Sequence, residues 1–116
     1  MALIELPEPW RRDVCAILKT EDTQVIQWTE DCRARYEADF FPAWPYEVYE
    51  PLRAFLEGNR PLGCPKNMQR PPGETYEFYF QFRSTKSYGK ILLRPDRRRI
   101  MLFSAHLPLQ ERLSCE

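Results

Sequence analysis

The residues between positions 66 and 106 include side chains that could cleave RNA without a metal ion. They are Lys66, Glu77, Tyr88, Lys90 and the only histidine, His106. Cleavage through the 2′-hydroxyl needs a base that takes the hydroxyl proton and an acid that protonates the leaving 5′-oxygen. Fixed cations must also stabilise the charge that grows on the phosphate. The chain has no Walker loop, no G-x-S-x-G and no H-E-x-x-H motif that would indicate another reaction.

A second set of side chains could bind RNA around this centre, because aromatic rings stack on unpaired bases and cations contact phosphates. The candidates are Tyr79, Arg83, Lys86, Arg94, Arg97, Arg98 and Arg99. Purely structural roles compete with these. Strand tyrosines commonly pack as cross-strand pairs, the three consecutive arginines follow a turn and could form a solvated tip, and a histidine at a strand end is often a surface residue. The residue types alone leave these alternatives open.

The formal net charge of the 116 residues is zero, but the two halves have opposite charge. Residues 1–59 hold 6 Lys or Arg and 12 Asp or Glu, whereas residues 60–116 hold 11 and 5. A cationic surface attracts phosphate whatever the total charge of the protein. The two halves could instead pair with each other across their interface.

Length and composition predict one packed domain, because 116 residues with 43% hydrophobic and 14% aromatic content can form a single core. No apolar run is long enough to span a bilayer, and the N-terminus lacks the apolar region of a signal peptide. We therefore expect a cytoplasmic protein with no membrane partner. The four cysteines form no C-x-x-C pair, so we expect reduced thiols, with no metal and no cofactor.

Three strands must position the candidate residues. Tyr76, Phe78, Phe80 and Phe82 alternate with polar or less apolar residues, as in a strand with one buried face. A second strand is expected over residues 88–94 and a third over 99–105, with turns at 84–87 and 94–97 between them. We expect the polar face of this sheet to carry the function.

The register between the second and third strands decides whether the candidates share a face. With a two-residue turn, Lys90 would lie opposite Met101, and Ser104 and His106 would point to the other side. A three-residue turn with a bulge places Tyr88 opposite Ser104 and puts Tyr88, Lys90, Ser104 and His106 on one face. We predict the three-residue turn.

The first half of the chain predicts helices. Apolar residues recur at helical spacing over residues 9–19 and 45–57, and Thr29 is a suitable N-cap for a helix that ends near residue 39. We therefore expect an α+β fold in which N-terminal helices pack on a small antiparallel sheet of three or four strands. Its parts are a mainly helical, acidic segment 1–58, a Pro-rich loop 59–74, a basic sheet 75–106 and a short tail 107–116.

Four short motifs in the second half resemble those of MqsR-type toxins. They are K-N-M at 66–68, T-Y-E-F-Y-F at 75–80, S-Y-G-K-I-L-L at 87–93 and I-M-L-F-S-A-H at 100–106. Their order and spacing are similar to those of the family, and the resemblance covers roughly residues 23–106. The family belongs to the RelE/ParE-like superfamily of small α+β toxins, which cleave mRNA and are neutralised by a cognate antitoxin.

The resemblance implies a role for each matching residue. Lys66 matches a functional lysine before the sheet, and Tyr88 and Lys90 match the Y-x-K-I motif of the family. Glu77 falls where the family tends to have glutamine. His106 stands where the family has a catalytic lysine, which keeps an acid–base group but changes its ordinary pKa by several units.

These implications predict an mRNA endoribonuclease that is the toxin of a toxin–antitoxin pair. Its expected partners are single-stranded mRNA, on or off the ribosome, and an antitoxin that covers the cationic face. We expect His106 to act as general acid or base with Glu77 as its partner, and Tyr88 to position the 2′-hydroxyl or stack on a base. Lys66, Lys90 and Arg94 would stabilise the phosphate charge. The alternative is a non-catalytic RNA-binding or protein-interaction module on the same scaffold.

Overall fold

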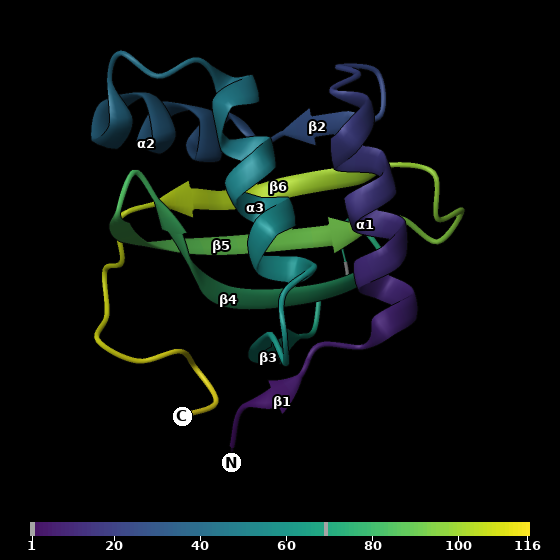
Figure 1. The fold of residues 1–116 in the computed structure, drawn as a ribbon. Helices are drawn as coiled ribbons and strands as arrows, with labels where there is room; N and C mark the ends of the chain where they lie inside the picture. Colours follow the sequence, from purple (N-terminus) through teal and green to yellow (C-terminus); the bar gives the residue numbers. More distant parts are fainter. Residues whose placement is uncertain (1, 69) are drawn as a thin grey trace.

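Six strands form one sheet in the part of the chain that the computed structural model describes, residues 2–68 and 70–116 (Figure 1). Their order across the sheet is β1-β3-β4-β5-β6-β2. Neighbouring strands are antiparallel, except that β2 runs parallel to β6. The strands are β1 Ile4–Glu5, β2 Ile26–Trp28, β3 Leu62–Lys66, β4 Glu74–Phe82, β5 Thr85–Leu93 and β6 Ile100–His106. The α+β class is confirmed, but the expected antiparallel sheet of three or four strands is wrong, as is the helix-first order, since β1 precedes the first helix.

The helices occupy the segments predicted for them. They are α1 Glu8–Thr20, α2 Glu30–Phe40, a 3-10 turn η1 Pro45–Val48 and α3 Tyr49–Leu56. Thr29 caps α2 as expected, because its hydroxyl accepts a hydrogen bond of 3.1 Å from the Cys32 N–H. Pro51 lies in the first turn of α3. Backbone N–H groups there have no acceptor within the helix, so the lack of an N–H in proline costs no helical hydrogen bond.

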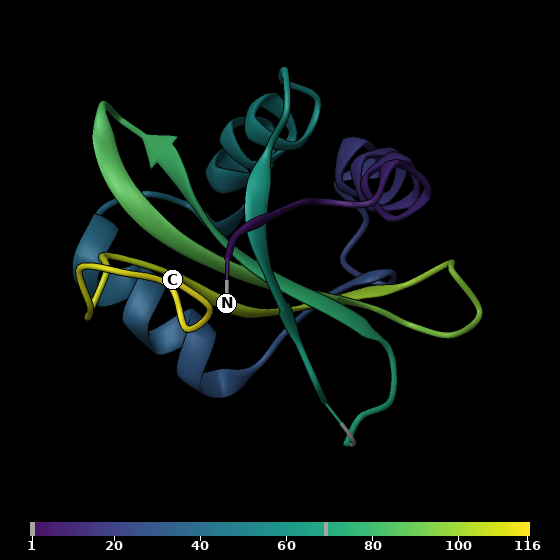
Figure 2. The same ribbon diagram turned by 90° about the horizontal axis from the view of Figure 1, so that it is seen from below.

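The helices leave one face of the sheet uncovered. In Figure 1, α1 and α3 lie across one face, while α2 lies beside β6 at the edge of the sheet, as Figure 2 also shows. The face under α1 and α3, here called the closed face, is apolar: Phe78 is fully buried and stacks on Phe55 of α3 at 5.0 Å between ring centroids. Trp10 of α1 packs edge-on against Tyr76 at 4.8 Å. The opposite face, here called the open face, carries Glu77 and its neighbours.

The Pro-rich segment 59–74 contains a strand, so the expectation of a wholly irregular loop there is wrong. Pro65 and Lys66 of β3 pair with Tyr76 and Thr75 of β4. A proline fits at this position because β1 pairs only with the start of β3, which leaves the far side of Pro65 without a partner strand. Lys66, expected in a loop, is therefore held at the end of a strand.

Both predicted turns differ from the observed ones. The first is the two-residue turn Arg83–Ser84, not 84–87, and both residues have positive φ, 55° and 61°. This is the conformation that a tight hairpin with right-handed strand twist requires. The second turn leaves four residues, 95–98, between Arg94 and Arg99, which are joined by a hydrogen bond of 2.9 Å. The three-residue turn is therefore wrong.

The predicted face is nevertheless formed. An irregularity between Lys90 and Ile91 skips one residue of β6, so that Lys90 lies opposite Ser104 and Tyr88 opposite His106. This register differs by two residues from the predicted one. Because strand side chains alternate with period two, a shift of two residues preserves the face. Tyr88, Lys90, Ser104 and His106 thus share the open face, as predicted.

Gly89, between Tyr88 and Lys90, provides a test of the packing behind this face. A β-carbon at Gly89 would lie 2.7 Å from Cε2 of Phe78, a ring already fixed by Phe55. Gly89→Ala is therefore expected to lower the free energy of unfolding by about 1–3 kcal/mol, measured by urea denaturation. An unchanged transition midpoint would contradict the close approach of the ring to this strand.

Candidate active site

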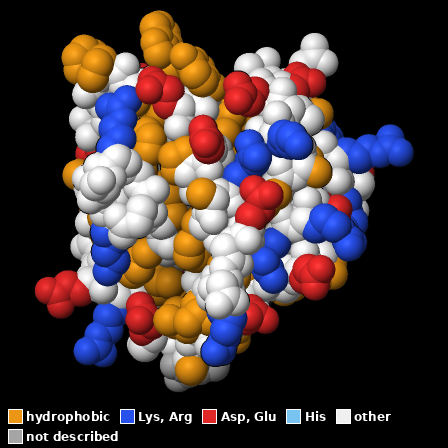
Figure 3. Space-filling view, in the orientation of Figure 1, with side chains coloured by type: hydrophobic (Ala, Val, Ile, Leu, Met, Phe, Trp, Pro, Cys, Tyr) orange, Lys and Arg blue, Asp and Glu red, His pale blue; other side chains and the backbone are white. Residues whose placement is uncertain are grey.

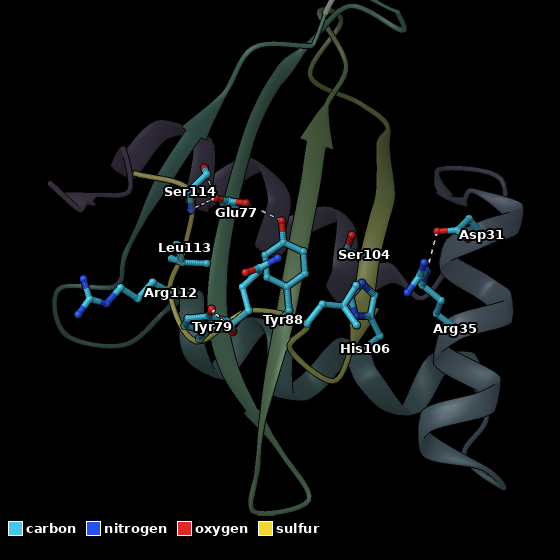
Figure 4. A pocket seen from close by; sticks show the side chains of 12 residues that line it. Asp31, Arg35, Glu77, Tyr79, Tyr88, Ser104, His106, Arg112, Leu113 and Ser114 are labelled. Atoms are coloured by element: carbon cyan, nitrogen blue, oxygen red, sulfur yellow. Dashed lines mark hydrogen bonds and ion pairs between the residues drawn. The ribbon is translucent and has the colours of Figure 1, made fainter. Parts of the chain in front are cut away.

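The open face carries a pocket of about 600 Å³, here called the open-face pocket (Figure 4). Its floor consists of side chains from three strands: Glu77 and Tyr79 of β4, Tyr88 of β5, and Ser104 and His106 of β6. One wall is α2, which contributes Asp31 and Arg35; the other is the C-terminal segment, which contributes Leu109, Gln110, Arg112, Leu113 and Ser114. Four predicted site residues, Glu77, Tyr79, Tyr88 and His106, thus line one cavity.

The C-terminal segment 107–116, here called the strap, lies over the open face, whereas the sequence predicted only a short tail. Figure 2 shows it returning from the end of β6 toward the N-terminus. Leu113 is buried, and Cys115 forms a disulfide with Cys64 of β3, with the Cα atoms 5.8 Å apart. The expectation of four reduced thiols is therefore wrong. The two cysteines are 51 residues apart in sequence, so only the fold reveals that they meet.

The other two cysteines, Cys15 and Cys32, are free and buried. Burial raises the pKa of the Cys15 thiol to about 11 and that of Cys32 to about 12. Both thiols therefore stay protonated and unreactive near neutral pH. The disulfide is the part of the cysteine chemistry that concerns the site.

Glu77 is the centre of the hydrogen bonding in the pocket. It is 3% exposed. One carboxylate oxygen accepts the Tyr88 hydroxyl at 2.5 Å, and the other accepts the Ser114 N–H at 2.9 Å and the Ser114 hydroxyl. Lys66 Nζ lies 4.0 Å from Oε1. Burial acts to raise the pKa of Glu77, but the Ser114 and Tyr88 hydrogen bonds and the Lys66 charge outweigh it and lower that pKa. The carboxylate is ionised at neutral pH.

His106 lies at the end of β6 and is 5% exposed. Its Nδ1 is 2.7 Å from the carbonyl oxygen of Leu107. A carbonyl can only accept, so this contact places a proton on Nδ1 and leaves the lone pair of the neutral ring on Nε2. Within residues 2–68 and 70–116, no side chain or backbone group hydrogen-bonds to Nε2. His106 can therefore accept a proton in the open-face pocket.

The expected pairing of His106 with Glu77 is not formed as a direct contact among the described residues. Tyr88 lies between them: its ring centroid is 5.4 Å from that of His106, and its hydroxyl donates to Glu77. Burial and the Glu77 carboxylate raise the pKa of Tyr88, so the phenol stays protonated. Glu77 thus fixes the position of Tyr88, and Tyr88 contacts the histidine.

The two predicted catalytic lysines flank Glu77. Lys66 Nζ is 3.4 Å from Ser114 Oγ, beside the carboxylate. Lys90 lies opposite Glu77 on one side and Ser104 on the other. Burial, and then the charge of Lys66, lower the pKa of Lys90. Lys66 and His106 therefore reach the same face from opposite sides of Tyr88.

Of the predicted RNA-binding residues, Tyr79 and Lys86 are near the pocket. Tyr79 lies opposite Tyr88, and its hydroxyl donates to the carbonyl of Gln110 in the strap at 3.0 Å. The Lys86 ammonium is 4.0 Å from the centre of the Tyr79 ring. This pair could hold one base of a single strand.

The five predicted arginines lie away from the pocket or are already paired. Arg83 pairs with Glu47 at 3.0 Å and Arg97 with Asp13 at 2.6 Å, so the acidic and basic halves do neutralise each other in part. Arg94 donates to Gln27, and Arg99 pairs with Asp96. Arg94, Arg97, Arg98 and Arg99 belong to the β5–β6 turn, which the seven-residue strand β6 separates from the His106 end by about 20 Å.

Sequence reasoning missed the two walls of the pocket. Arg35, which is 3.1 Å from Asp31, comes from a helix expected to cover the apolar face. Arg112 belongs to the strap, whose ten residues show no periodicity. The available signal in the strap was its three leucines, Leu107, Leu109 and Leu113, which are more apolar than a solvated chain end usually is.

Protein-family models, curated proteins and solved structures give no match to this chain. In the described ranges, no group of three or more His, Cys, Asp or Glu side chains is placed to hold a metal ion. The described helices include none that is both long and apolar enough to cross a membrane.

Proposed function

We propose that this chain is an endoribonuclease that cleaves mRNA by general acid–base catalysis. We further propose that it is the toxin of a cytoplasmic toxin–antitoxin pair, of the MqsR-like and RelE/ParE-like kind. The observation that carries the proposal is the meeting of Glu77, Tyr88 and His106 in one pocket. They come from three consecutive strands, and their side chains are of the types that acid–base cleavage of RNA needs.

The geometry suits cleavage through the 2′-hydroxyl. Nε2 of His106 takes the hydroxyl proton, the 2′-oxygen attacks phosphorus, and the bond from phosphorus to the 5′-oxygen breaks. We assign the proton for the leaving oxygen to the ammonium of Lys90, because Lys90 lies opposite Glu77 and Ser104 of the pocket floor and burial lowers its pKa. The products are a 2′,3′-cyclic phosphate and a 5′-hydroxyl. Tyr88, held by Glu77, orients the reacting ribose.

Substrate binding requires a single strand, because the pocket floor offers aromatic rings to unpaired bases. Tyr79 would stack on a base, and Arg35 on the α2 wall would contact a phosphate. An antitoxin would cover the same face with an acidic or apolar segment.

The direct test is incubation of the full chain, in its oxidised form and after reduction with dithiothreitol, with a long unstructured mRNA in excess EDTA, followed by mapping of the new ends. Discrete cuts with cyclic phosphate ends are the expected result. If the RNA stays intact, the test is repeated with translating ribosomes. A second absence of cuts would sink the nuclease proposal.

A second candidate function, protein interaction without catalysis, is favoured by one surface feature. Phe41, Trp44 and Tyr46 in the connection between α2 and α3 are 83%, 66% and 55% exposed. Figure 3 shows large apolar side chains protruding at this upper edge of the molecule. Exposed aromatic groups of this kind mark interaction surfaces. An interaction module would bind a partner protein and would neither cut nor bind RNA.

A further inference from the structure

The strap contacts the open face mainly through hydrogen bonds of Leu107, Gln110 and Ser114 and buries little apolar surface. At its start, the Leu107 N–H donates to Asp39 of α2 at 2.9 Å. Further along, only Leu113 is buried, and the remaining strap residues are exposed or half-buried. One buried side chain is little to hold ten residues against the conformational entropy of a free chain end. The disulfide between Cys64 and Cys115 is the covalent restraint on the strap, and it holds Ser114 next to Glu77, where the hydrogen bonds form.

Where the strap is held, it occupies Glu77, which positions Tyr88, and Lys66, which is expected to stabilise the phosphate charge. Ser114 donates twice to the Glu77 carboxylate, and its hydroxyl lies 3.4 Å from Lys66 Nζ. Figure 4 shows Leu113 and Ser114 lying over β4 beside Glu77 and Tyr79. The Ser114 hydroxyl can donate to the Glu77 carboxylate and accept from the Lys66 ammonium. A ribose hydroxyl at the same place would make the same two interactions. The strap thus fills the site with a part of its own chain.

We propose that the strap is an autoinhibitory cover, latched by the Cys64–Cys115 disulfide, and that reduction of this bond opens the site to RNA. The proposal rests on the proposed function, because it assigns the same pocket as the site that is covered. In the oxidised protein, Ser114 competes with substrate for Glu77 and Lys66. In the reduced protein, the strap leaves the face, and both groups become accessible.

The chemistry of opening is a thiol–disulfide exchange. A dithiol attacks the half-buried Cys115 sulfur, and the bond to the fully buried Cys64 sulfur breaks. The second thiol of the reagent then displaces Cys115. Two electrons and two protons pass to the protein, which ends with two thiols, and the reagent becomes a disulfide. A reducing cytoplasm would supply dithiols of this class.

The experiment compares cleavage of a fluorescent single-stranded RNA by the oxidised protein, by the same protein with dithiothreitol, and by Cys115→Ser. If the open form is about a tenth or less of the oxidised protein, unlatching raises kcat/KM about tenfold or more. Cys115→Ser should match the reduced wild type and should not respond to dithiothreitol, which controls for effects of the reagent elsewhere.

Hydrogen exchange provides a readout that does not depend on catalysis. The amide of Ser114 should lose its protection on reduction, because it donates to Glu77 only while the strap is in place. Core amides of Phe78 and Ile91 should stay protected, which shows that the sheet remains folded. Unchanged Ser114 protection would overturn the latch.

The two assays together separate the possible failures. A released strap with unchanged or lower cleavage would overturn autoinhibition and would make the strap a working wall of the pocket. If neither redox state cuts RNA while Ser114 is released on reduction, the nuclease assignment fails and the latch stands.

Discussion

Replacement of His106 by alanine is expected to slow RNA cleavage by about 10²- to 10⁴-fold, the usual contribution of a general acid or base. The reason is the tautomer: the Leu107 carbonyl holds the proton on Nδ1 and leaves Nε2 as the base in the pocket. Single-turnover cleavage of a short fluorescent RNA, with enzyme in excess, measures this step without product release.

A matched variant separates chemistry from folding. His106→Asn places an amide N–H at the position of Nδ1, where it can donate to the Leu107 carbonyl, but it has no base at the position of Nε2, so it should lose as much activity as His106→Ala. Lys19→Ala, on an exposed position of α1 across the sheet, should cleave at the wild-type rate. A folded His106→Asn protein with wild-type activity would show that another group is the base.

The face of each strand was predictable because it depends only on local alternation. The aromatic residues of β4 alternate with Glu77 and Tyr79, and this pattern alone places Glu77 opposite the apolar core. The lengths of both turns were predicted wrongly. The predicted register of β5 and β6 was wrong by two residues. Because side chains alternate between the faces with period two, this shift left the same residues on the open face.

Features that depend on long-range contacts were not predictable from local pattern. Strand β3 is rich in turn-forming residues and is a strand only because β4 and β1 accept its backbone hydrogen bonds. The disulfide joins residues 51 positions apart. The wall that α2 forms depends on its place beside β6, which amphipathic spacing does not specify.

The ion pairs of the arginines were a further feature that the sequence did not predict. Sequence proximity to the sheet indicated one cationic surface, whereas ion pairs use several of its members to join elements. Arg97 connects the β5–β6 turn to Asp13 of α1 and Glu74 of β4. Composition records how many charges a segment has, but it does not record which charges are already paired. The cations nearest the open-face pocket are therefore Arg35 of α2 and Lys66 beside Glu77, and not those of the arginine-rich turn.

Glu77→Gln is expected to lower the free energy of unfolding at pH 7 by about 2–3 kcal/mol, because charge-assisted hydrogen bonds from Tyr88 and Ser114 are lost in a buried site. The pH dependence follows from the pKa of Glu77, which the fold lowers below the ordinary value. A carboxylate with a lowered pKa stabilises the fold above its unfolded pKa, near 4.3, and loses that contribution as the pH falls through the folded pKa. The difference between wild type and variant should therefore be largest at neutral pH and should shrink below about pH 4.

Urea denaturation of both proteins between pH 3 and 7 measures this difference. Glu111→Gln removes an exposed carboxylate of the strap that has no partner among the described residues, and it should change stability by less than about 0.5 kcal/mol. Tyr88→Phe should lose only part of the stability, because Ser114 and Lys66 still hold the ionised carboxylate. It should be less acid-sensitive than the wild type, because one hydrogen bond that lowers the pKa of Glu77 is gone. A wild type and Glu77→Gln that differ equally at pH 3 and pH 7 would show that Glu77 is not the ionised centre of the open-face pocket. The arrangement that fixes Tyr88 beside His106 would then have to depend on packing rather than on charge.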